Sequence, residues 1–276
     1  MLKTIISYLN HYLSEGICVA FSGGADSALL LKAACMAREA AGGTHPEILA
    51  LTVQTRLHPP EDTLEAQALA QAMGARWMLL PIDEFTDPAI LENPKNRCYL
   101  CKRLLFSSIK KAAQNQGCLH VFDGTNLDDT REYRPGLRAL KELSIRSPFM
   151  DLAISKSQVR ELSAALGLKT AQKPAAPCMA TRLPYGARLE YQLLDRIHQG
   201  EQYLQSLGLK NVRLRYHAPL VRIEVDKEDF PLLMKHREEI IQKLHELDFS
   251  YITLDLEGFR SGSMDLILSA SERSAD

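Results

Sequence analysis

The first half of the chain alternates between short apolar runs and longer segments with apolar residues at helical spacing. Residues 17–21 are apolar without interruption, which is typical of a strand buried on both faces, and residues 28–41 carry the period of a helix. This alternation predicts a parallel, doubly wound α/β sheet whose connections are helices. The predicted strands are 17–21, 47–53, 76–82 and 119–122, and the predicted helices are 28–41, 61–73, 98–116 and 155–166.

A proline-rich segment separates this pattern from a different one. Residues 173–186 contain three prolines and no apolar period, so we expect an irregular connector and a domain boundary there. We predict domains at residues 1–170 and 171–276, the second being a smaller α+β domain. Its expected helices are 189–207 and 230–247, its expected strands are 212–216, 220–225 and 251–256, and the polar residues 269–276 are expected to be disordered.

The composition is that of a globular protein without a long nucleic-acid partner. The 276 residues are 46% hydrophobic and 24% charged, and the formal net charge is -1. Proteins that bind nucleic acids usually have a strong basic excess. No apolar run approaches the roughly 18 residues of a membrane span, and the first residues predict an amphipathic helix rather than a signal peptide. We therefore expect a cytoplasmic protein with no membrane and no nucleic-acid partner.

The loop after the first predicted strand carries candidate chemistry. Small residues let the backbone approach phosphate oxygens, and a helix start offers unpaired N–H groups at the positive end of its dipole. Hydroxyls add donors, and the carboxylate of Asp26 can hold Mg²⁺. An ordinary glycine turn capped by Asp26 or Ser27 is the alternative. The predicted phosphate-binding residues are Ser22, Gly23, Gly24, Asp26 and Ser27.

A second loop, at residues 123–126, follows the last predicted strand of the first domain. Ligands of doubly wound sheets sit beyond the carboxyl ends of the strands, so the two loops can face one crevice. We predict that Gly124 and Asn126 lie near a nucleotide and that Arg131 meets its phosphates. The alternative is an ordinary turn from strand to helix with an acidic start.

The chain has six cysteines in three settings. Cys18, Cys35 and Cys118 lie among apolar neighbours and are expected to be buried and unreactive. Cys98 and Cys101 form a C-x-x-C pair, which fits a redox dithiol, half a zinc site, part of an iron–sulfur site, or two incidental thiols. Cys178 follows two prolines at the expected domain junction, where a cleft is expected, and a buried structural thiol is the alternative.

Predicted strands of the second domain carry arginine on one face. Because side chains alternate along a strand, Arg213 and Arg215 share a face. Arginine binds phosphates and carboxylates through paired hydrogen bonds. We predict an anion site, with a solvated sheet face holding internal ion pairs as the alternative. Its residues would be Arg213, Arg215, Glu224 and, from the turn at 258–263, Arg260.

These motifs together resemble one family. Ser-Gly-Gly-x-Asp-Ser after a strand is similar to the PP-loop of the Rossmann-like ATP pyrophosphatases. The other motifs resemble the LarE family within that group, the ATP-dependent sulfur transferases that build the nickel-pincer cofactor of lactate racemase. Ala25 in a variable loop position, and Phe259 where tyrosine is usual, are small departures. The resemblance covers nearly the whole chain, with motifs at 21–24, 123–126, 133–136, 177–182, 185–186 and 255–263.

The resemblance implies a substrate, cofactors and catalytic residues. The substrate would be a pyridinium mononucleotide with two carboxylates, and ATP with Mg²⁺ would adenylylate one carboxylate and release pyrophosphate. In one version of the family the cysteine matching Cys178 gives up its own sulfur. In another, cysteines matching Cys98, Cys101 and Cys178 hold a [4Fe–4S] cluster, and a sulfide on its open iron is transferred. We favour the cluster version because the C-x-x-C pair is present, and Cys178 is the catalytic residue in both.

The resemblance also implies partners and leaves other functions open. Other enzymes of the nickel-pincer pathway would be partners, and we expect a homo-oligomer. PP-loop enzymes with cysteines also thiolate tRNA, although the net charge of -1 disfavours this function. A non-enzymatic ATP-sensing or iron–sulfur carrier protein would bind nucleotide or cluster and release no pyrophosphate.

Overall fold

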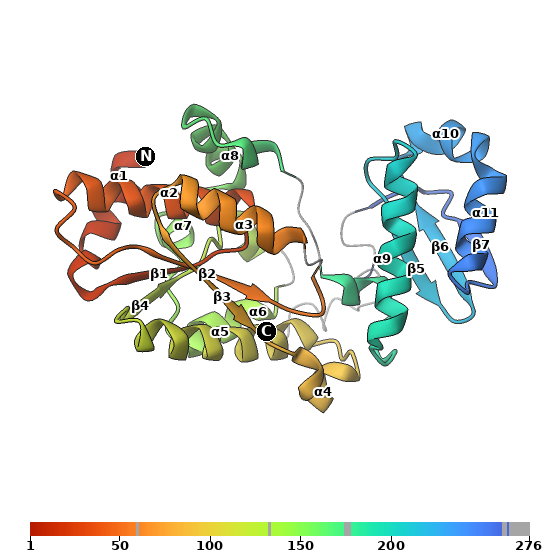
Figure 1. The fold of residues 1–276 in the computed structure, drawn as a ribbon, viewed down its shortest axis with the longest axis horizontal. Coiled ribbons are helices and arrows are strands. Elements are labelled where there is room, and N and C mark those ends of the chain that lie inside the picture. Colours follow the sequence, from red (N-terminus) through yellow and green to blue (C-terminus); the bar gives the residue numbers. More distant parts are fainter. Residues whose placement is uncertain (59–60, 132–133, 174–177, 261–263, 265–276) are drawn as a thin grey trace. The chain divides into compact units, whose positions relative to one another are not determined.

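The computed structural model describes residues 1–58, 61–131, 134–173, 178–260 and 264. The chain divides into two compact units. The first unit comprises residues 1–84 and 96–176, and the second comprises residues 85–95 and 177–275. Each unit has its own β-sheet (Figure 1).

The first unit is built on a four-stranded parallel sheet. Its strands are β1 (Ile17–Ala20), β2 (Leu49–Gln54), β3 (Arg76–Pro81) and β4 (His120–Phe122), in the order β3-β2-β1-β4. Every pairing is parallel, and Cys18 of β1 lies opposite Leu49 on one side and Val121 on the other. The strand order reverses between β1 and β4, which is where sheets of this kind bind ligands, beyond the carboxyl ends of the strands.

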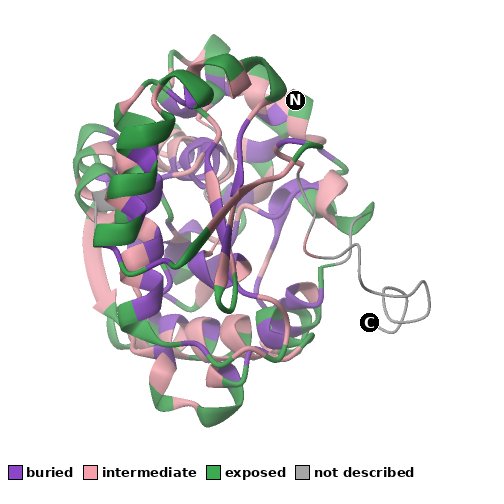
Figure 2. Ribbon diagram, turned by 90° about the vertical axis from the view of Figure 1, so that its right-hand side faces the viewer, coloured by how far each residue is buried: buried purple, intermediate pink, exposed green. Residues whose placement is uncertain are grey.

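Helices cover both faces of this sheet (Figure 1). One core contains Ile17 and Val19 of β1, and the other contains Cys18, because successive strand side chains point to opposite faces. Most residues of β1, β2 and β4 are buried, whereas β3, at the edge of the sheet, has no buried residue. Exposed positions in Figure 2 lie on the outer sides of the helices. The first core is formed with α1 (Leu2–Asn10), α2 (Ala25–Ala40), α3 (Glu61–Ala72), α7 (Pro148–Asp151) and α8 (Lys156–Ala165), and the second with α5 (Arg97–Asn115) and α6 (Gly136–Glu142).

The predicted doubly wound parallel sheet is confirmed. Each predicted element of this unit begins and ends no more than three residues from the observed element. The largest difference is at α2, which begins at Ala25 rather than at residue 28. Gly24 is extended, with φ -80° and ψ 170°, and its carbonyl accepts the first helical hydrogen bond, from Ala28 N at 2.9 Å.

The second unit contains the predicted smaller α+β arrangement. Its sheet has the order β5-β6-β7, with β5 and β6 antiparallel and β6 and β7 parallel. The helix predicted at 230–247 is two helices that meet at His236. The elements are α4 (Pro88–Leu91), α9 (Tyr191–Ser206), β5 (Arg213–His217), β6 (Leu220–Glu224), α10 (Phe230–Lys235), α11 (Arg237–Glu246) and β7 (Tyr251–Leu254).

Short 3₁₀ turns complete the described fold. They are η1 (Leu13–Glu15), η2 (Glu84–Thr86), η3 (Leu127–Arg131), η4 (Lys169–Gln172), η5 (Met179–Arg182) and η6 (Lys227–Asp229). Among the helices of the described ranges, none has the length and apolarity needed to cross a bilayer. The segment 269–276, expected to be disordered, lies outside the described residues.

One segment from the first half of the sequence belongs to the second unit. Residues 85–95 leave the first unit and include α4. Asn93 Nδ2 donates to Pro184 O at 2.9 Å, and Asn93 O accepts from Gly186 N at 2.9 Å. Leu189 N donates to Leu91 O at 2.8 Å. These long-range bonds, which no local sequence pattern reveals, place an excursion inside the span that the sequence analysis assigns to the first domain.

The capping box of α8 allows a stability test. Ser155 Oγ accepts from Gln158 N at 3.4 Å, and Ser155 N donates to Gln158 Oε1 at 2.9 Å. Ser155→Ala is expected to lower the free energy of unfolding by about 1 kcal/mol, because it leaves helix-start N–H groups without an acceptor. Urea denaturation measures this. The control, Ser107→Ala, changes an exposed serine inside α5, and equal effects of both substitutions would contradict the capping role.

Candidate functional site

The loop between β1 and α2 leaves its backbone donors open at a helix start. Gly23 has φ +71°, a left-handed conformation that glycine adopts without strain, and a Cβ there would lie 3.3 Å from Ala66 Cβ of α3. No side chain of the described residues caps α2, so the alternative, an ordinary glycine turn capped by Asp26 or Ser27, does not form. Since Ala28 N is the first amide bonded within the helix, the three amides before it have no helical acceptor. This arrangement suits a bound anion.

The two serines of this loop lie side by side. Ser22 Oγ and Ser27 Oγ are 3.2 Å apart, and Ser22 Oγ also accepts from Gly24 N at 3.3 Å. Ser27 Oγ donates to Gly24 O at 3.2 Å. Ser22 is exposed and Ser27 is buried, so the Ser22 hydroxyl is the accessible one of the pair. The local hydrogen bonds hold both hydroxyls at the start of α2, as the sequence predicts for a phosphate loop.

Gly124 brings the second predicted loop against the start of α2. A Cβ on Gly124 would lie 2.9 Å from Asp26 Cβ and 2.9 Å from Ser27 N. Real Cβ atoms do not approach backbone so closely, so only glycine fits here. The loops after β1 and β4 therefore meet, and the prediction that they share one end of the sheet is correct within the first unit.

Asp26 is the centre of a polar network between these loops. Its Oδ1 accepts from Asn126 Nδ2 at 3.2 Å, and its Oδ2 accepts a hydrogen bond from Lys156 Nζ. Asn126 is buried, and its Oδ1 accepts from Asp128 N at 3.0 Å. The Asp26 side chain keeps 24% of its surface exposed. A carboxylate and an ammonium group thus stand beside the uncapped start of α2.

Lys156 is a residue that the sequence analysis missed. It is the first residue of α8, directly after the predicted cap Ser155. Its backbone N–H donates to Asp128 Oδ2 at 2.7 Å, while its side chain reaches Asp26. The sequence pattern identifies the helix start at this position, but the partner is 130 residues away in the chain. The signal that could have identified Lys156 is its place at the start of a helix that follows β4, the last strand of the first unit.

Lys102 is a second missed residue. Asp123, at the end of β4, is buried and accepts hydrogen bonds from Ser147 Oγ and, at 2.5 Å, from Thr125 Oγ1. Lys102 Nζ lies 4.0 Å from Asp123 Oδ2. The lysine stem passes across Gly136, where a Cβ would come within 2.6 Å of Lys102 Cδ. The start of α5 therefore reaches the same end of the sheet as the glycine loop.

Arg131 contacts the outer edge of the Asp26 network through Asp128 and does not reach Asp26 itself. Its side chain is 71% exposed, and its Nη1 lies 3.4 Å from Asp128 Oδ1. No described contact connects it to Asp26 or to the residues at the start of α2. The nearby motif residues 132 and 133 lie outside the described residues. A role of Arg131 at the nucleotide stays a prediction.

The C-x-x-C pair lies in the first turns of α5. Cys98 is exposed, Cys101 is half-buried, and Arg97 Nη2 is 3.7 Å from Cys98 Sγ. The helix has no carboxylate residue, and its cations are Arg97, Lys102, Arg103, Lys110 and Lys111. Within the described ranges no group of three or more His, Cys, Asp or Glu side chains is placed to hold a metal ion, so a cluster ligated by Cys98, Cys101 and Cys178 stays a prediction.

Cys178 directly precedes the turn η5 of the second unit. It is half-buried, and its carbonyl accepts from Thr181 N at 3.0 Å and from Thr181 Oγ1 at 2.8 Å. Thr181 therefore holds the backbone carbonyl of the residue that carries this thiol. Pro174 and Pro177, the prolines that indicated a cleft near Cys178, lie outside the described residues.

Arginines of the second unit gather around two buried carboxylates. Arg182 makes a bidentate pair with Glu201, with both N···O distances 2.8 Å, and both side chains are almost fully buried. Arg215 Nε lies 2.8 Å from Glu224 Oε1, and Arg222 Nη2 lies 2.9 Å from the same oxygen. The ion pairs that the sequence analysis kept as the alternative to an anion site therefore exist, although Arg215 and Glu224 are buried rather than solvated. Arg182 and Glu201 were not predicted as members of these ion pairs.

Arg213 gives this cluster an excess of positive charge. No carboxylate of the described residues pairs with it, and its guanidinium lies 5.3 Å from the centre of the Phe259 ring. Burial, and then the neighbouring charge of Arg182, lowers the pKa of Arg213, although Glu201 opposes the shift. A half-buried cation without a paired carboxylate among the described residues suits an anionic ligand. Arg260 lies at a more exposed place and pairs with Glu257 at 2.8 Å.

Comparison with known proteins identifies the family. The pyridinium-3,5-bisthiocarboxylic acid mononucleotide synthase of Lactiplantibacillus plantarum is 34% identical over 258 residues, which cover 94% of this chain and 92% of that protein. The chain belongs to the LarE family. The uncharacterized protein slr1717 of Synechocystis sp. is 38% identical over 97% of this chain and 99% of its own length. A family profile described as NAD synthase matches residues 1–97.

A further relative extends the similarity beyond the LarE family. The NH(3)-dependent NAD(+) synthetase of Pyrobaculum aerophilum is 29% identical over 70% of this chain and 73% of its own length. The NAD synthase profile covers β1, β2, β3 and the glycine loop. The first unit is therefore a PP-loop domain, which implies ATP and Mg²⁺, and LarE membership supports a sulfur transferase that uses ATP.

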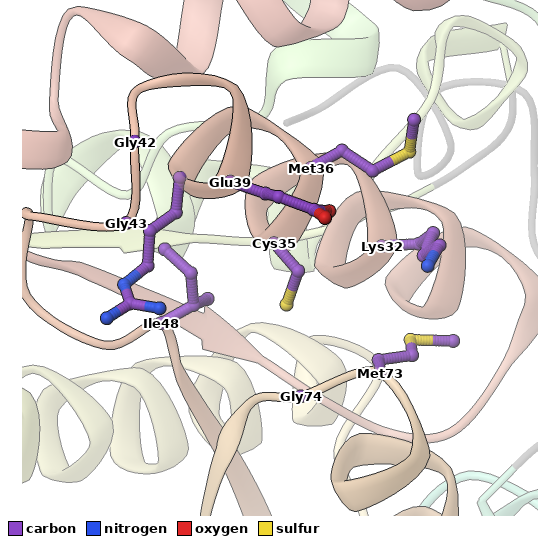
Figure 3. A pocket seen from close by; sticks show the side chains of 10 residues that line it. Lys32, Cys35, Met36, Glu39, Gly42, Gly43, Ile48, Met73 and Gly74 are labelled. Atoms are coloured by element: carbon purple, nitrogen blue, oxygen red, sulfur yellow. The ribbon is translucent and has the colours of Figure 1, made fainter.

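A separate cavity lies at the other end of α2 from the glycine loop (Figure 3). Its volume is about 440 Å³, and it is lined by residues including Lys32, Cys35, Met36 and Met73. Cys35 was expected to be buried but is half-buried and lines this cavity. Burial raises its pKa to about 11, and the expectation that this thiol is unreactive stays a prediction.

The buried pair in the second unit gives a stability prediction. Glu201→Ala leaves Arg182 buried without its carboxylate and is expected to lower the free energy of unfolding of the second unit by about 3–5 kcal/mol. Denaturation followed by circular dichroism measures the loss. Glu257→Ala, the control, removes the exposed partner of Arg260 and should cost less than about 1 kcal/mol. A loss at Glu201 as small as that at Glu257 would contradict the structural weight given to the buried pair.

Proposed function

We propose that this protein is an ATP-dependent sulfur transferase of nickel-pincer cofactor biosynthesis. Its substrate is a pyridinium-dicarboxylate mononucleotide, one carboxylate of which becomes a thiocarboxylate. The observation that carries the proposal is the uncapped start of α2, with Asp26 held between Asn126 and Lys156. The similarity to a named pyridinium-3,5-bisthiocarboxylic acid mononucleotide synthase supports the substrate class.

The first step uses the phosphate loop. The amides at the start of α2, the Ser22 hydroxyl and the Lys156 ammonium group bind the ATP phosphates. An oxygen of the substrate carboxylate attacks the α-phosphorus of ATP. The bond between the α-phosphorus and pyrophosphate breaks, pyrophosphate leaves with the electron pair, and a mixed anhydride of the carboxylate with AMP forms. This step converts a poor leaving group into a good one, because AMP leaves far more readily than hydroxide.

Mg²⁺ fits the donors of this loop. The ion prefers oxygen ligands and is usually held by one or two carboxylates together with substrate phosphates. Asp26 supplies such a carboxylate, half-buried and adjacent to the helix start. Mg²⁺ would neutralise charge on the leaving pyrophosphate. Lys156 then shares the neutralisation of the phosphates with the helix start.

The transferred sulfur has two candidate sources, which differ in the role of the cysteine thiols. In the first, Cys178 attacks the adenylated carboxylate, AMP leaves, and a thioester forms. Elimination then breaks the Cβ–S bond, so the thiocarboxylate leaves and dehydroalanine remains at position 178. In the second, Cys98, Cys101 and Cys178 would hold a [4Fe–4S] cluster, which would supply the sulfide that is transferred. The donor set fits, since three thiolates leave one iron of such a cluster without a protein ligand.

The second unit would bind the substrate's anionic groups. Arg213 has no paired carboxylate among the described residues and stands beside Arg182 and Arg215. Arg213, Arg215 and Arg260 would bind a phosphate or carboxylate, and Glu224 would hold Arg215 and Arg222 in place. Action in the cytoplasm as a homo-oligomer, beside other enzymes of the pathway, belongs to the same proposal.

The adenylylation step has a direct test. ATP, Mg²⁺ and the dicarboxylate mononucleotide together are expected to yield pyrophosphate, measured with a coupled phosphate assay. Lys156→Ala is expected to raise the KM for ATP on the order of tenfold, because a charged hydrogen bond to phosphate is lost. Lys32→Ala on α2, at the separate cavity, is the matched control and should behave as the wild type. Wild-type protein that binds ATP and releases no pyrophosphate would instead favour an ATP-sensing or carrier protein.

The role of Cys178 has its own test. Cys178→Ala is expected to abolish thiocarboxylate formation and to leave pyrophosphate release largely intact. Cys35→Ala, which changes another half-buried thiol, is the control and should retain both activities. Mass spectrometry of the peptide containing residue 178 after one turnover separates the sulfur sources, since self-sacrifice removes the elements of H₂S from the peptide. Loss of both activities in Cys178→Ala would mean that this thiol is structural.

A further inference from the structure

We propose that Thr52 is a positioning residue for the phosphate loop and sets the affinity for ATP. The inference rests on the proposed function, because the ligand of the loop is taken to be ATP. Thr52 lies on β2, outside the glycine motif, and is 4% exposed. Its hydroxyl bonds to the last residue before Ser22.

The backbone ladder between β1 and β2 ends at this point. The last strand pair in the register is Ala20 opposite Leu51, and Phe21 N still donates to Leu51 O at 2.8 Å. The next bond is made by a side chain, since Thr52 Oγ1 donates to Phe21 O at 2.8 Å. The carbonyl that precedes the phosphate loop is thus fixed by a hydroxyl at the position where the strand ends.

A third strand fixes the hydroxyl in turn. Trp77 Nε1 of β3 donates to Thr52 Oγ1 at 3.0 Å. An indole N–H can only donate and a carbonyl can only accept, so the direction of both bonds is unambiguous and the Thr52 hydroxyl has a single orientation. The relay Trp77–Thr52–Phe21 therefore ties β3, β2 and β1 together directly beside the start of the loop.

Helix α3 packs against the start of the phosphate loop. Ala66 of α3 is fully buried and lies against Gly23 of the loop, and Trp77 packs against the same apolar core. Gly23 is thus confined on the side of α3, and Phe21 O is confined on the side of β2. With both fixed, the loop amides are held ready before a ligand arrives, and such preorganisation lowers the cost of binding.

Removal of the hydroxyl should act on binding rather than on turnover. Thr52→Val keeps the volume of the side chain, leaves Phe21 O and Trp77 Nε1 without their partner, and is expected to weaken ATP binding on the order of tenfold. The KM for ATP should rise by the same factor at unchanged kcat, since no reacting atom touches Thr52. Thr52→Ser restores the hydroxyl and should bind ATP within about twofold of the wild type.

The experiment is equilibrium dialysis of the full chain with ATP and Mg²⁺, beside thermal denaturation of each variant. Thr253→Val is the matched control, because Thr253 Oγ1 also donates to a strand carbonyl, Val221 O at 3.2 Å, but in the second unit. It should bind ATP as the wild type does. Trp77→Phe keeps the Thr52–Phe21 bond and should weaken ATP binding by about two- to threefold, which gives a second variant if Thr52→Val does not fold.

The results separate this inference from the proposed function. Wild-type affinity in Thr52→Val, or equal weakening in Thr52→Ser and Thr52→Val, would overturn the positioning role and leave the sulfur transferase proposal intact. A wild-type protein that fails to bind ATP would overturn both. Weakening confined to Thr52→Val and, to a smaller extent, Trp77→Phe would support the relay.

Discussion

The candidate site depends on one close approach of two backbone segments. Gly124, at the end of β4, lies so near the start of α2 that a Cβ would come within 2.9 Å of Ser27 N. This contact joins the loops after two adjacent parallel strands at the point where the strand order reverses. Because the contact leaves no room for a side chain, it brings Asn126 within hydrogen-bond distance of Asp26. The carboxylate, the amide and the uncapped helix start then form one anion-binding edge.

Charge is distributed differently in the two units. In the first, the uncapped start of α2 stands beside the Lys156 ammonium group and the Asp26 carboxylate. In the second, Arg182 and Glu201 neutralise each other while buried, and Arg213 remains in excess. A neutralised pair contributes structure, whereas an excess cation contributes affinity for an anion. In the proposed function, the first unit binds ATP and the second binds the anionic groups of the substrate.

Local sequence predicted much of this and missed what is long-range. The order of strands and helices follows from apolar periodicity, and the glycine loop follows from its residues and its place after a strand. Lys156 and Lys102 were missed because their importance lies in contacts with Asp26 and Asp123, 130 and 21 residues away. The excursion of residues 85–95 into the second unit was missed because its hydrogen bonds reach residues 184–189. Gly136 belongs to one of the sequence motifs, but only the structure shows why glycine stands there, which is that the side chain of Lys102 passes across it.

The central claim is that a substrate carboxylate attacks ATP bound at the start of α2. The most direct measurement supplies the mononucleotide with oxygen-18 in its carboxylates and analyses the AMP formed by mass spectrometry. Attack on the α-phosphorus followed by displacement with sulfur predicts one oxygen-18 atom in each AMP. Unlabelled AMP, or label found only in inorganic phosphate, would contradict carboxylate adenylylation.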